Sequence, residues 1–586
     1  MVYHAAAQVV AAFGAIDLPT GEWNTLLPTL FHNVSSPEVD VGCKVASLEA
    51  LGYMCDSMNP NQVEKSLVDQ ILNTIVDGMR ADRPNVMKLA AVTAMCNSLD
   101  FTETNFEIQA ERDHIMSAIC AATQCDDLKV RVKSFECLAT VANYYYSKLP
   151  GYIDSLFQLT MKAIKSDEQV VGQQAIEFWS TICDTEAQMV DDLKEGEELE
   201  EGVTYFRIVE QAARGLVPEL LETLTKQDDS GSDESWNIAL AGAACLDVVA
   251  QTIGDSVVDL ILPFVTANIN STNWHQKEAA IMAFGSILDG PSAEKLTPIV
   301  VGALPHLIGC VRDAHPIVRD SSAWTIGRIC EFHIQAITNE MITPMVTALT
   351  IALEDSEAKV AAQACYAFYN MAAACEDTSE DSSNVLSVFM QPVLTKLLAV
   401  TNREDWDTDN LRTSAYEAVN MLVANSASDM LPVVFLLLGE ALNRLEVSWA
   451  DHSEPLEKMN LQSQLCSLVG TCVQKLPEEQ LKTASDRIMT LVLQVFQMKG
   501  AVAHEDAFMT IGYLAGKLGA DFARYASFLM PAVLTGLRNI EEHSVVIVAG
   551  GVVGDLCRAL NKGVLVYCDD VMRCLLELLQ SQTVNR

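Results

Sequence analysis

The stretch 316-PIVRDSSAWTIGRICE-331 decides the fold, because its residues fall on two helical faces of different chemistry. One face follows the spacing of a buried helical stripe and consists of Val318, Ser322, Thr325, Ile326 and Ile329. The opposite face carries Asp320, Trp324, Gly327 and Glu331. A large aromatic ring between two carboxylates is unusual on a surface helix, so this face is a candidate binding surface.

The same pattern returns along the chain with a period of 42 residues. Placing 278-EAAIMAFGSILDG-290 under 320-DSSAWTIGRICEF-332 aligns acid with acid, small residue with small residue and glycine with glycine. A third copy, 360-VAAQACYAFYNMA-372, begins 42 residues after Val318. A period of about 40 residues is typical of arrays of helical hairpins, in which each hairpin buries its apolar face by stacking on its neighbours.

The repeat predicts an all-α fold, namely a HEAT-repeat (armadillo-type) right-handed superhelical solenoid. We expect a single continuous array over residues 1–586 with about thirteen hairpins, the first represented only by its second helix. The spacing of Asp313, Val318 and Arg319 resembles the HEAT repeat, in which Asp and Arg of successive repeats form a polar ladder and the Val is core. Neither end carries the polar capping repeat that such arrays need, so we expect a piece of a longer solenoid.

The composition narrows the possible functions. The chain has 78 acidic and 38 basic residues, which gives a formal charge of -40. This argues against a nucleic-acid binder, which needs basic surface, and favours a basic partner or high solubility. The seventeen cysteines include no CxxC pair and no zinc spacing, and the apolar runs are too short for membrane insertion.

Three inserts interrupt the regular spacing, near residues 184–202, 227–236 and 375–384. All three are acidic. The first is expected to be a solvated, mobile connector. The second is longer than a turn between paired helices requires, and the third is also rich in serine and open to phosphorylation.

No motif for catalysis is present, since the chain lacks a phosphate-binding loop, an HExxH sequence and a GxSxG elbow. We therefore expect no enzyme, no cofactor and no metal site. Binding is the remaining use of the array. A surface on which acids alternate with aromatic rings can bind Lys and Arg side chains of a partner. The carboxylates form ion pairs with the charged groups, and the rings make cation–π contacts with them. The alternative is that Trp324 and Tyr366 pack as ordinary core between adjacent repeats.

Several segments resemble importin-beta, the karyopherin-beta family of nuclear transport receptors. They include 272-TNWHQKEAAIMAFGSILDGP-291, 313-DAHPIVRDSSAWTIGRICE-331 and 521-DFARYASFLMPAVLTGLRN-539. The likeness runs collinearly over the whole chain. It implies a nuclear import receptor that lacks the first and last repeats of the family.

The resemblance implies that an acidic concave face holds the basic arm of importin-alpha or basic signals on cargo proteins. By position, the residues of this face are Trp236, Glu278, Asp289, Asp320, Trp324, Glu331 and Tyr366. It also implies an acidic loop that contacts cargo and Ran-GTP, here Asp228, Asp229, Asp233 and Glu234.

On the outer face, the resemblance implies a groove that accepts Phe-Gly repeats of nucleoporins. Its residues are Leu72, Val76, Glu111, His114 and Ile115, and His114 stands where the family commonly carries Phe. Ran-GTP releases cargo in this family, but its principal site lies in the first repeats, so we expect that site to be missing here. The implied location is cytoplasm and nucleus, with shuttling through pores of the nuclear envelope.

The competing interpretation is a HEAT scaffold of another class, such as the structural subunit of protein phosphatase 2A. Scaffolds of that kind have uniform repeats and bind through their short turns. The acidic inserts and the stripe of acids and aromatic rings argue against this alternative.

Overall fold

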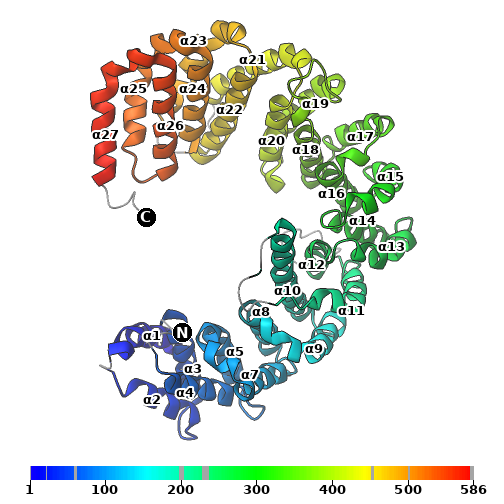
Figure 1. Ribbon diagram of the computed structural model, residues 1–586, viewed down its shortest axis with the longest axis vertical. Helices are drawn as coiled ribbons and strands as arrows, with labels where there is room; N and C mark the ends of the chain where they lie inside the picture. The colour runs from blue at the N-terminus through cyan, green and yellow to red at the C-terminus, as the bar shows by residue number, and fades with distance from the viewer. Residues whose placement is uncertain are drawn as a thin grey trace. The chain divides into compact units, whose positions relative to one another are not determined.

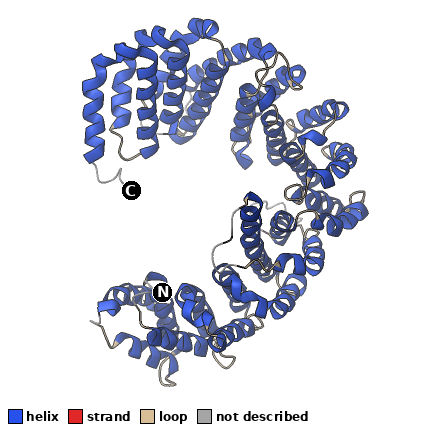
Figure 2. Cartoon of the chain, in the orientation of Figure 1, coloured by secondary structure: helices blue, strands red, loops and turns tan. Residues whose placement is uncertain are grey.

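The computed structural model describes residues 2–20, 23–58, 63–196, 199, 204–227, 237–450, 454–498 and 502–580. It divides into two compact units, residues 1–299 and 300–586. All regular secondary structure in the described residues is helical (Figure 2). The predicted all-α class is therefore confirmed for this part of the chain.

Unit 1 consists of antiparallel hairpins, each made of a first and a second helix (Figure 1). The first helices are α2 (Leu26–Ser35), α4 (Lys65–Gly78), α7 (Gln109–Ala122), α9 (Ile153–Ser166), α11 (Ile208–Thr223) and α13 (Ser256–Asn268). The second helices are α1 (Val2–Thr20), α3 (Val41–Ser57), α5 (Asn85–Ser98), α8 (Leu128–Tyr145), α10 (Gln169–Glu195), α12 (Ile238–Ile253) and α14 (Trp274–Ser286). The short helix α6 (Glu103–Glu107) precedes α7.

Unit 2 repeats this organisation, and α15 (Ala293–Cys310) runs across the boundary between the two units. Its first helices are α17 (Asn339–Ala352), α19 (Ser387–Val400), α21 (Leu431–Ser448), α23 (Glu478–Val495), α25 (Ala523–Leu537) and α27 (Cys568–Gln580). Its second helices are α16 (Pro316–Phe332), α18 (Ala358–Ala373), α20 (Leu411–Ala424), α22 (Pro455–Lys475), α24 (Val502–Leu518) and α26 (His543–Leu560).

Four second helices of unit 1, namely α3, α8, α12 and α14, begin where a polar side chain accepts hydrogen bonds from their first backbone N–H groups. The Asp127 side chain accepts hydrogen bonds from the backbone N–H of Lys129 and Val130 at α8, and Asn237 does the same at α12. Within each unit, a second helix packs on the next one, as α3 does on α5 and α16 on α18. The stripe of α16 is buried as predicted, since Val318 and Ile326 are fully inaccessible to solvent.

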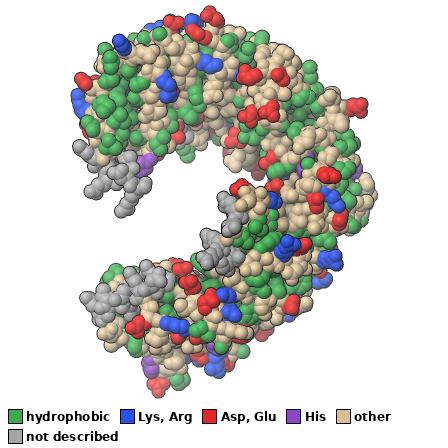
Figure 3. All heavy atoms as spheres, viewed as in Figure 1, with side chains coloured by type: hydrophobic (Ala, Val, Ile, Leu, Met, Phe, Trp, Pro, Cys, Tyr) green, Lys and Arg blue, Asp and Glu red, His purple; other side chains and the backbone are tan. Residues whose placement is uncertain are grey.

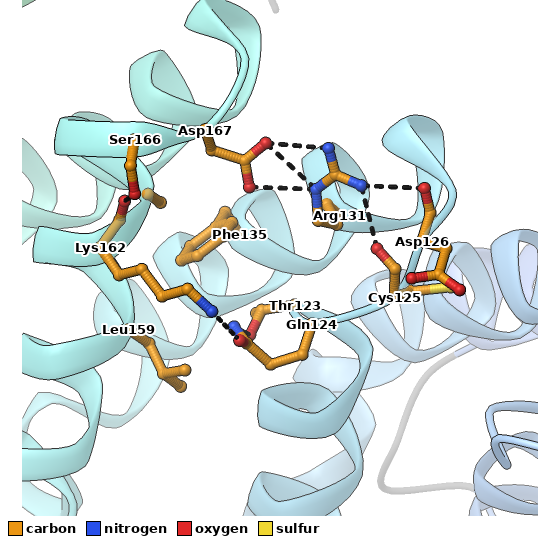
Figure 4. A pocket seen from close by; sticks show the side chains of 11 residues that line it. Thr123, Gln124, Cys125, Asp126, Arg131, Phe135, Leu159, Lys162, Ser166 and Asp167 are labelled. Atoms are coloured by element: carbon orange, nitrogen blue, oxygen red, sulfur yellow. Dashed lines mark hydrogen bonds and ion pairs between the residues drawn. The ribbon is translucent and has the colours of Figure 1, made fainter.

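The predicted polar ladder is confirmed in both units. In unit 2, Arg319 donates to both carboxylate oxygens of Asp355 in the next repeat, at 2.6 and 2.8 Å. In unit 1, Arg131 donates to Asp167 at 2.8 to 3.2 Å and to the Cys125 carbonyl (Figure 4). A cavity of about 340 Å³ lies beside this pair, between α7, α8 and α9.

The prediction for the insert at 184–202 is wrong over its first part. Residues 184–195 continue helix α10, which is 27 residues long. Glu186 is fully buried there and accepts hydrogen bonds from the Tyr146 hydroxyl and from the backbone N–H of Ile208 and Val209. This carboxylate caps the start of α11. An acidic residue that was predicted to be solvated therefore links its own hairpin to the next one.

The insert at 375–384 is anchored to the following repeats. The backbone N–H of Ser428 donates to the Asp381 carbonyl at 2.9 Å, and that of Asp429 donates to the Ser382 carbonyl at 3.1 Å. Lys475, at the end of α22, donates to the Ser379 carbonyl at 3.0 Å. The insert, called the strap below, therefore contacts the connection between α20 and α21 and the end of α22.

The end of unit 2 is rich in apolar side chains. The stretch His543–Leu579 is long and apolar enough by composition to cross a membrane. Here it is divided into α26 and α27, and α26 packs against α24 and α25, as a repeat helix does. Apolar side chains also lie on the visible surface of α27, where Met572, Leu576 and Leu579 are more than half exposed (Figure 3).

Candidate functional site

The predicted groove residues meet between two first helices of unit 1. Leu72 and Val76 are one turn apart on α4, and Glu111, His114 and Ile115 share one face of α7. All five line a cavity of about 140 Å³, together with Asp69, Asn73 and Asn105. The structure thus brings together every residue that the resemblance assigned to this groove.

The floor of this groove is apolar and nearly closed. Leu72, Val76 and Ile115 are only 4%, 7% and 3% exposed. His114 is exposed and lies at the edge. The cavity therefore exposes little of its apolar floor, and its other lining residues are polar.

A polar cluster spans the rim of the groove. Lys65 Nζ lies 2.9 Å from Asp69 on the same helix and 3.1 Å from Glu111 on α7. The Asn105 side-chain amide, which is buried, donates to the same two carboxylates at 2.7 and 2.8 Å. Sequence reasoning identified only Glu111 of this cluster. The i, i+4 spacing of Lys65 and Asp69 was a usable signal, whereas nothing local pointed to Asn105.

The electrostatics of the rim follow from these bonds. The hydrogen bond to Asp69 raises the pKa of Lys65. Burial alone would raise the pKa of Asp69, but hydrogen bonds from Lys65 and Asn105 outweigh it, so this pKa lies below its ordinary value. The rim is therefore charged at neutral pH and joins α4 to α7 across the apolar floor.

The acid–aromatic stripe, defined in unit 2 by Asp320, Trp324 and Glu331 on α16 and Tyr366 on α18, is partly different from the prediction. The expectation that Asp320 projects from the helix is wrong. It is 9% exposed, and Lys359 Nζ lies 3.5 Å from its carboxylate. Lys359 of this chain thus already pairs with Asp320, the carboxylate that was predicted to bind a lysine or arginine of a partner.

Trp324 is half-buried and also carries a cation of this chain. The Arg328 guanidinium lies 5.4 Å from the centre of the Trp324 ring and 5.0 Å from that of Phe332. Such distances are in the range of cation–π contact. Arg328 of this chain therefore lies over the ring that was predicted to receive a cation of the partner, and the binding of a partner there stays a prediction.

Tyr366 packs between repeats and faces an acid. Its hydroxyl donates a hydrogen bond to Glu331, and burial together with this carboxylate raises its pKa. Its ring lies against the backbone of Gly327, where an added Cβ would be 2.4 Å from Tyr366 Cδ1. The packing interpretation of Tyr366 is therefore confirmed, and its role in binding a partner stays a prediction.

The corresponding acids of unit 1 have other roles. Glu278 is 4% exposed and accepts a hydrogen bond from Gln227, whose side chain also donates to the His275 carbonyl at 2.9 Å. The expectation that Glu278 projects from the concave face is thus wrong as well. Asp289 follows α14 and accepts from Gln251 at 3.0 Å. Outside the described residues lie Trp236 and the acidic loop of Asp228, Asp229, Asp233 and Glu234.

Among the described residues, no group of three or more His, Cys, Asp or Glu side chains is arranged to hold a metal ion. The visible surface of each unit carries acidic side chains with Lys and Arg as smaller patches among them (Figure 3). The structure thus contains two candidate binding sites, the groove between α4 and α7 in unit 1 and the acid–aromatic stripe in unit 2.

Comparison with known proteins identifies relatives over nearly the whole chain. Residues 344–586 match the family described as importin subunit beta-1-like, TPR repeats, and residues 274–329 match HEAT-like repeats. Importin subunit beta-1 of Arabidopsis thaliana is 40% identical over 99% of this chain and 68% of its own length. The predicted HEAT-repeat class is confirmed by these matches.

Two solved structures are similar over the same extent. A complex of Kap95 with Nup1 has a TM-score of 0.90 at 29% identity and covers 99% of this chain and 68% of the Kap95 chain. A structure of Kap95p that concerns the switch loops of RanGDP has a TM-score of 0.80 at 30% identity, with the same coverage.

Proposed function

The chain belongs to the importin-beta family of nuclear import receptors, and from this premise we propose how it binds its partners. The groove between α4 and α7 takes Phe-Gly repeats of nucleoporins, and the acid–aromatic stripe takes the basic arm of importin-alpha or basic cargo. A scaffold of the protein phosphatase 2A type is not favoured, because the relatives are transport receptors.

The observation that carries the first proposal is the convergence of five residues on one cavity. Leu72, Val76 and Ile115 supply an apolar floor for a phenyl ring, while Glu111 and Asn105 supply polar atoms at the rim. A Phe-Gly segment offers an aromatic side chain next to a backbone that can approach closely at glycine. The complex of Kap95 with Nup1 supports a nucleoporin as the ligand.

A binding titration tests the groove. A fluorescent Phe-Gly peptide would be titrated with wild type, with Leu72→Ala and with the control Leu436→Ala, which removes a 71% exposed leucine of α21. We expect Leu72→Ala to weaken binding about fivefold or more, equivalent to about 1 kcal/mol, and the control to have no effect. Equal affinity of folded Leu72→Ala and wild type would refute the groove assignment.

The second proposal is supported by the cations that the stripe already holds. Lys359 pairs with Asp320, and Arg328 lies over Trp324, so both the carboxylate and the ring accept cations in this environment. Glu331 adds a further exposed carboxylate at the end of α16. A basic helix would bind by replacing the chain's own cations at these positions.

Calorimetry with the importin-alpha arm tests this proposal. Trp324→Ala is expected to weaken binding about fivefold or more. The control is Trp406→Ala, because Arg412 also stacks on that ring, at 3.3 Å, but Trp406 lies outside the stripe. A loss of affinity that is the same in both variants would contradict a specific role of Trp324.

We further propose that Ran in its GTP form reduces binding of the basic arm by contacting the acidic loop of Asp228, Asp229, Asp233 and Glu234, as the release step of import. We also propose that the chain shuttles between cytoplasm and nucleus through nuclear pores. The solved structure of Kap95p that concerns the switch loops of RanGDP supports the proposed effect of Ran. A pull-down on Phe-Gly repeats with the basic arm, with and without Ran-GTP, separates pore binding from cargo release.

A further inference from the structure

The side chain of Asn105 has one end that is hydrogen-bonded and one end that is not. Asn105 lies on the short helix α6, lines the groove between α4 and α7 and is only 3% exposed. Its Nδ2 group donates to Asp69 at 2.7 Å and to Glu111 at 2.8 Å. Among the residues that the structure describes, no donor lies within hydrogen-bonding distance of the Asn105 Oδ1 atom.

The orientation of this amide is fixed by its neighbours. Asp69 and Glu111 both pair with Lys65, so the two carboxylates are ionised and can only accept hydrogen bonds. A flipped amide would place its oxygen against two carboxylates and would lose both hydrogen bonds. Oδ1 therefore stays at the end of the amide that faces away from the two acids, as an acceptor without a donor.

The backbone that carries Asn105 is held in place as well. The next residue, Phe106, is 1% exposed and stacks on Tyr145 of α8, with ring centres 3.8 Å apart. The Asn105 carbonyl accepts a hydrogen bond from the backbone N–H of Ile108 at 3.2 Å. The side-chain oxygen is thus a preorganised acceptor in the wall of the groove.

This acceptor and the apolar floor together define the ligand that fits the groove. A buried acceptor without a donor is unfavourable, and a ligand N–H placed against it removes that penalty. Leu72, Val76 and Ile115 line the same cavity and favour an apolar side chain. The ligand therefore needs an N–H group close to an apolar side chain. A backbone N–H beside an aromatic residue meets this need, and glycine brings its backbone closest because it has no Cβ.

We infer that Asn105 Oδ1 accepts the backbone N–H of the glycine in a Phe-Gly segment, so that Asn105 is a specificity-determining residue of the groove. The inference rests on the proposed function of the groove and adds a reason why the residue after Phe matters. The phenyl ring supplies the apolar contact, and the glycine supplies the donor that Oδ1 lacks. A Phe-Pro segment offers the same ring without a donor, because proline has no backbone N–H.

Replacing one backbone amide of the ligand by an ester tests this hydrogen bond. A fluorescent peptide with a single Phe-Gly unit would be compared with the same peptide in which an ester oxygen replaces the glycine N–H, a change that removes the donor and adds no bulk. We expect the ester to bind wild type about five- to tenfold more weakly, the range of one hydrogen bond. The matched control carries the ester in place of the Phe N–H and should bind as the parent peptide does. Equal affinity of the glycine ester and the parent peptide would overturn the inference, as would the same loss with the control ester.

Two variants of the chain show whether Asn105 is the acceptor. In Asn105→Leu, the parent peptide and the glycine ester should bind with equal affinity, because any effect on folding is common to both peptides. Asn73→Leu makes the same change at an exposed asparagine of the same cavity and should keep the wild-type preference. An ester effect that persists in Asn105→Leu would contradict the assignment. The comparison on wild type decides the question even if Asn105→Leu does not fold.

The outcome for Asn105 is distinguishable from the outcome for the groove. If Leu72→Ala weakens binding of the parent peptide while the glycine ester binds wild type normally, the groove holds the ring and Asn105 only links α4 to α7. If folded Leu72→Ala binds the parent peptide as wild type does, the groove assignment fails and the inference fails with it. A Phe-Pro peptide should bind wild type about five- to tenfold more weakly than the Phe-Gly peptide, and equal binding would also refute the role of Asn105.

Discussion

Replacing Asp355 by Asn in the polar ladder gives a perturbation with a calculable effect. One carboxylate oxygen accepts from Arg319 Nη2 and from the Glu357 backbone N–H, and the other accepts from Arg319 Nε. The amide keeps one of these oxygens and turns an N–H₂ group toward the guanidinium. Because both side chains of the pair are less than 20% exposed, losing this charged hydrogen bond costs about 2 to 3 kcal/mol.

Hydrogen exchange measured by mass spectrometry reports the loss of stability at individual segments of the chain. This method is suitable because a repeat array need not unfold in a single two-state transition. The expected cost corresponds to about 30- to 150-fold faster exchange in the turn before α18 and in its first turn. The control Asp377→Asn makes the same change at an exposed acid of unit 2. Exchange rates within threefold of wild type at the turn before α18 would refute the reasoning.

The same carboxylate gives a pH dependence of defined sign. Burial would raise the pKa of Asp355, but its bonds to Arg319 and to the Glu357 N–H hold it below the ordinary value of 3.8. The ion pair therefore contributes stability that is complete above the unfolded pKa and is lost as the pH falls through the lower folded pKa. The difference between wild type and Asp355→Asn should disappear in that acid range, after correction for intrinsic exchange rates.

Three further outcomes are expected. His114→Phe should strengthen binding of a Phe-Gly peptide about fivefold, because it adds an apolar ring at the edge of the groove, and unchanged anisotropy titrations would contradict this. Lys475→Ala should release the strap at 375–384, which limited proteolysis would detect as faster cleavage there than in Lys396→Ala. Gly327→Ala should destabilise unit 2 by about 1 to 3 kcal/mol, because the new methyl group displaces the Tyr366 ring; thermal melts identical to wild type would show that the ring relaxes freely.

Periodicity predicted the elements of this fold well because it reports which face of a helix is buried. Val318 and Ile326 lie in the core for that reason, and Arg319 reaches Asp355 because the repeat places them one unit apart. The five residues predicted for the groove also line one cavity, but that set came from family resemblance, since no local pattern links α4 to α7. The binding of Phe-Gly repeats there stays a prediction.

The errors concern acids whose partners come from other elements. Asp320 was assigned to the surface because it lies opposite the apolar stripe, yet Lys359 from α18 covers it. Glu186 lies in a strongly acidic run, and its burial depends on Tyr146 and on the start of α11. Such contacts are set by tertiary packing, and hydrophobic periodicity contains no information about them.

The presence of Lys359 at Asp320 and of Arg328 at Trp324 changes what basic-arm recognition means energetically. Lys359 and Arg328 act as counterions that the chain itself supplies to the stripe. Each Lys or Arg of a partner must therefore displace one of them when it binds. Each contact then yields less net free energy than the new pairing alone would give, because a pairing within the chain is lost. Selectivity should favour long ligands that exchange several positions at once, and isolated basic side chains should be rejected.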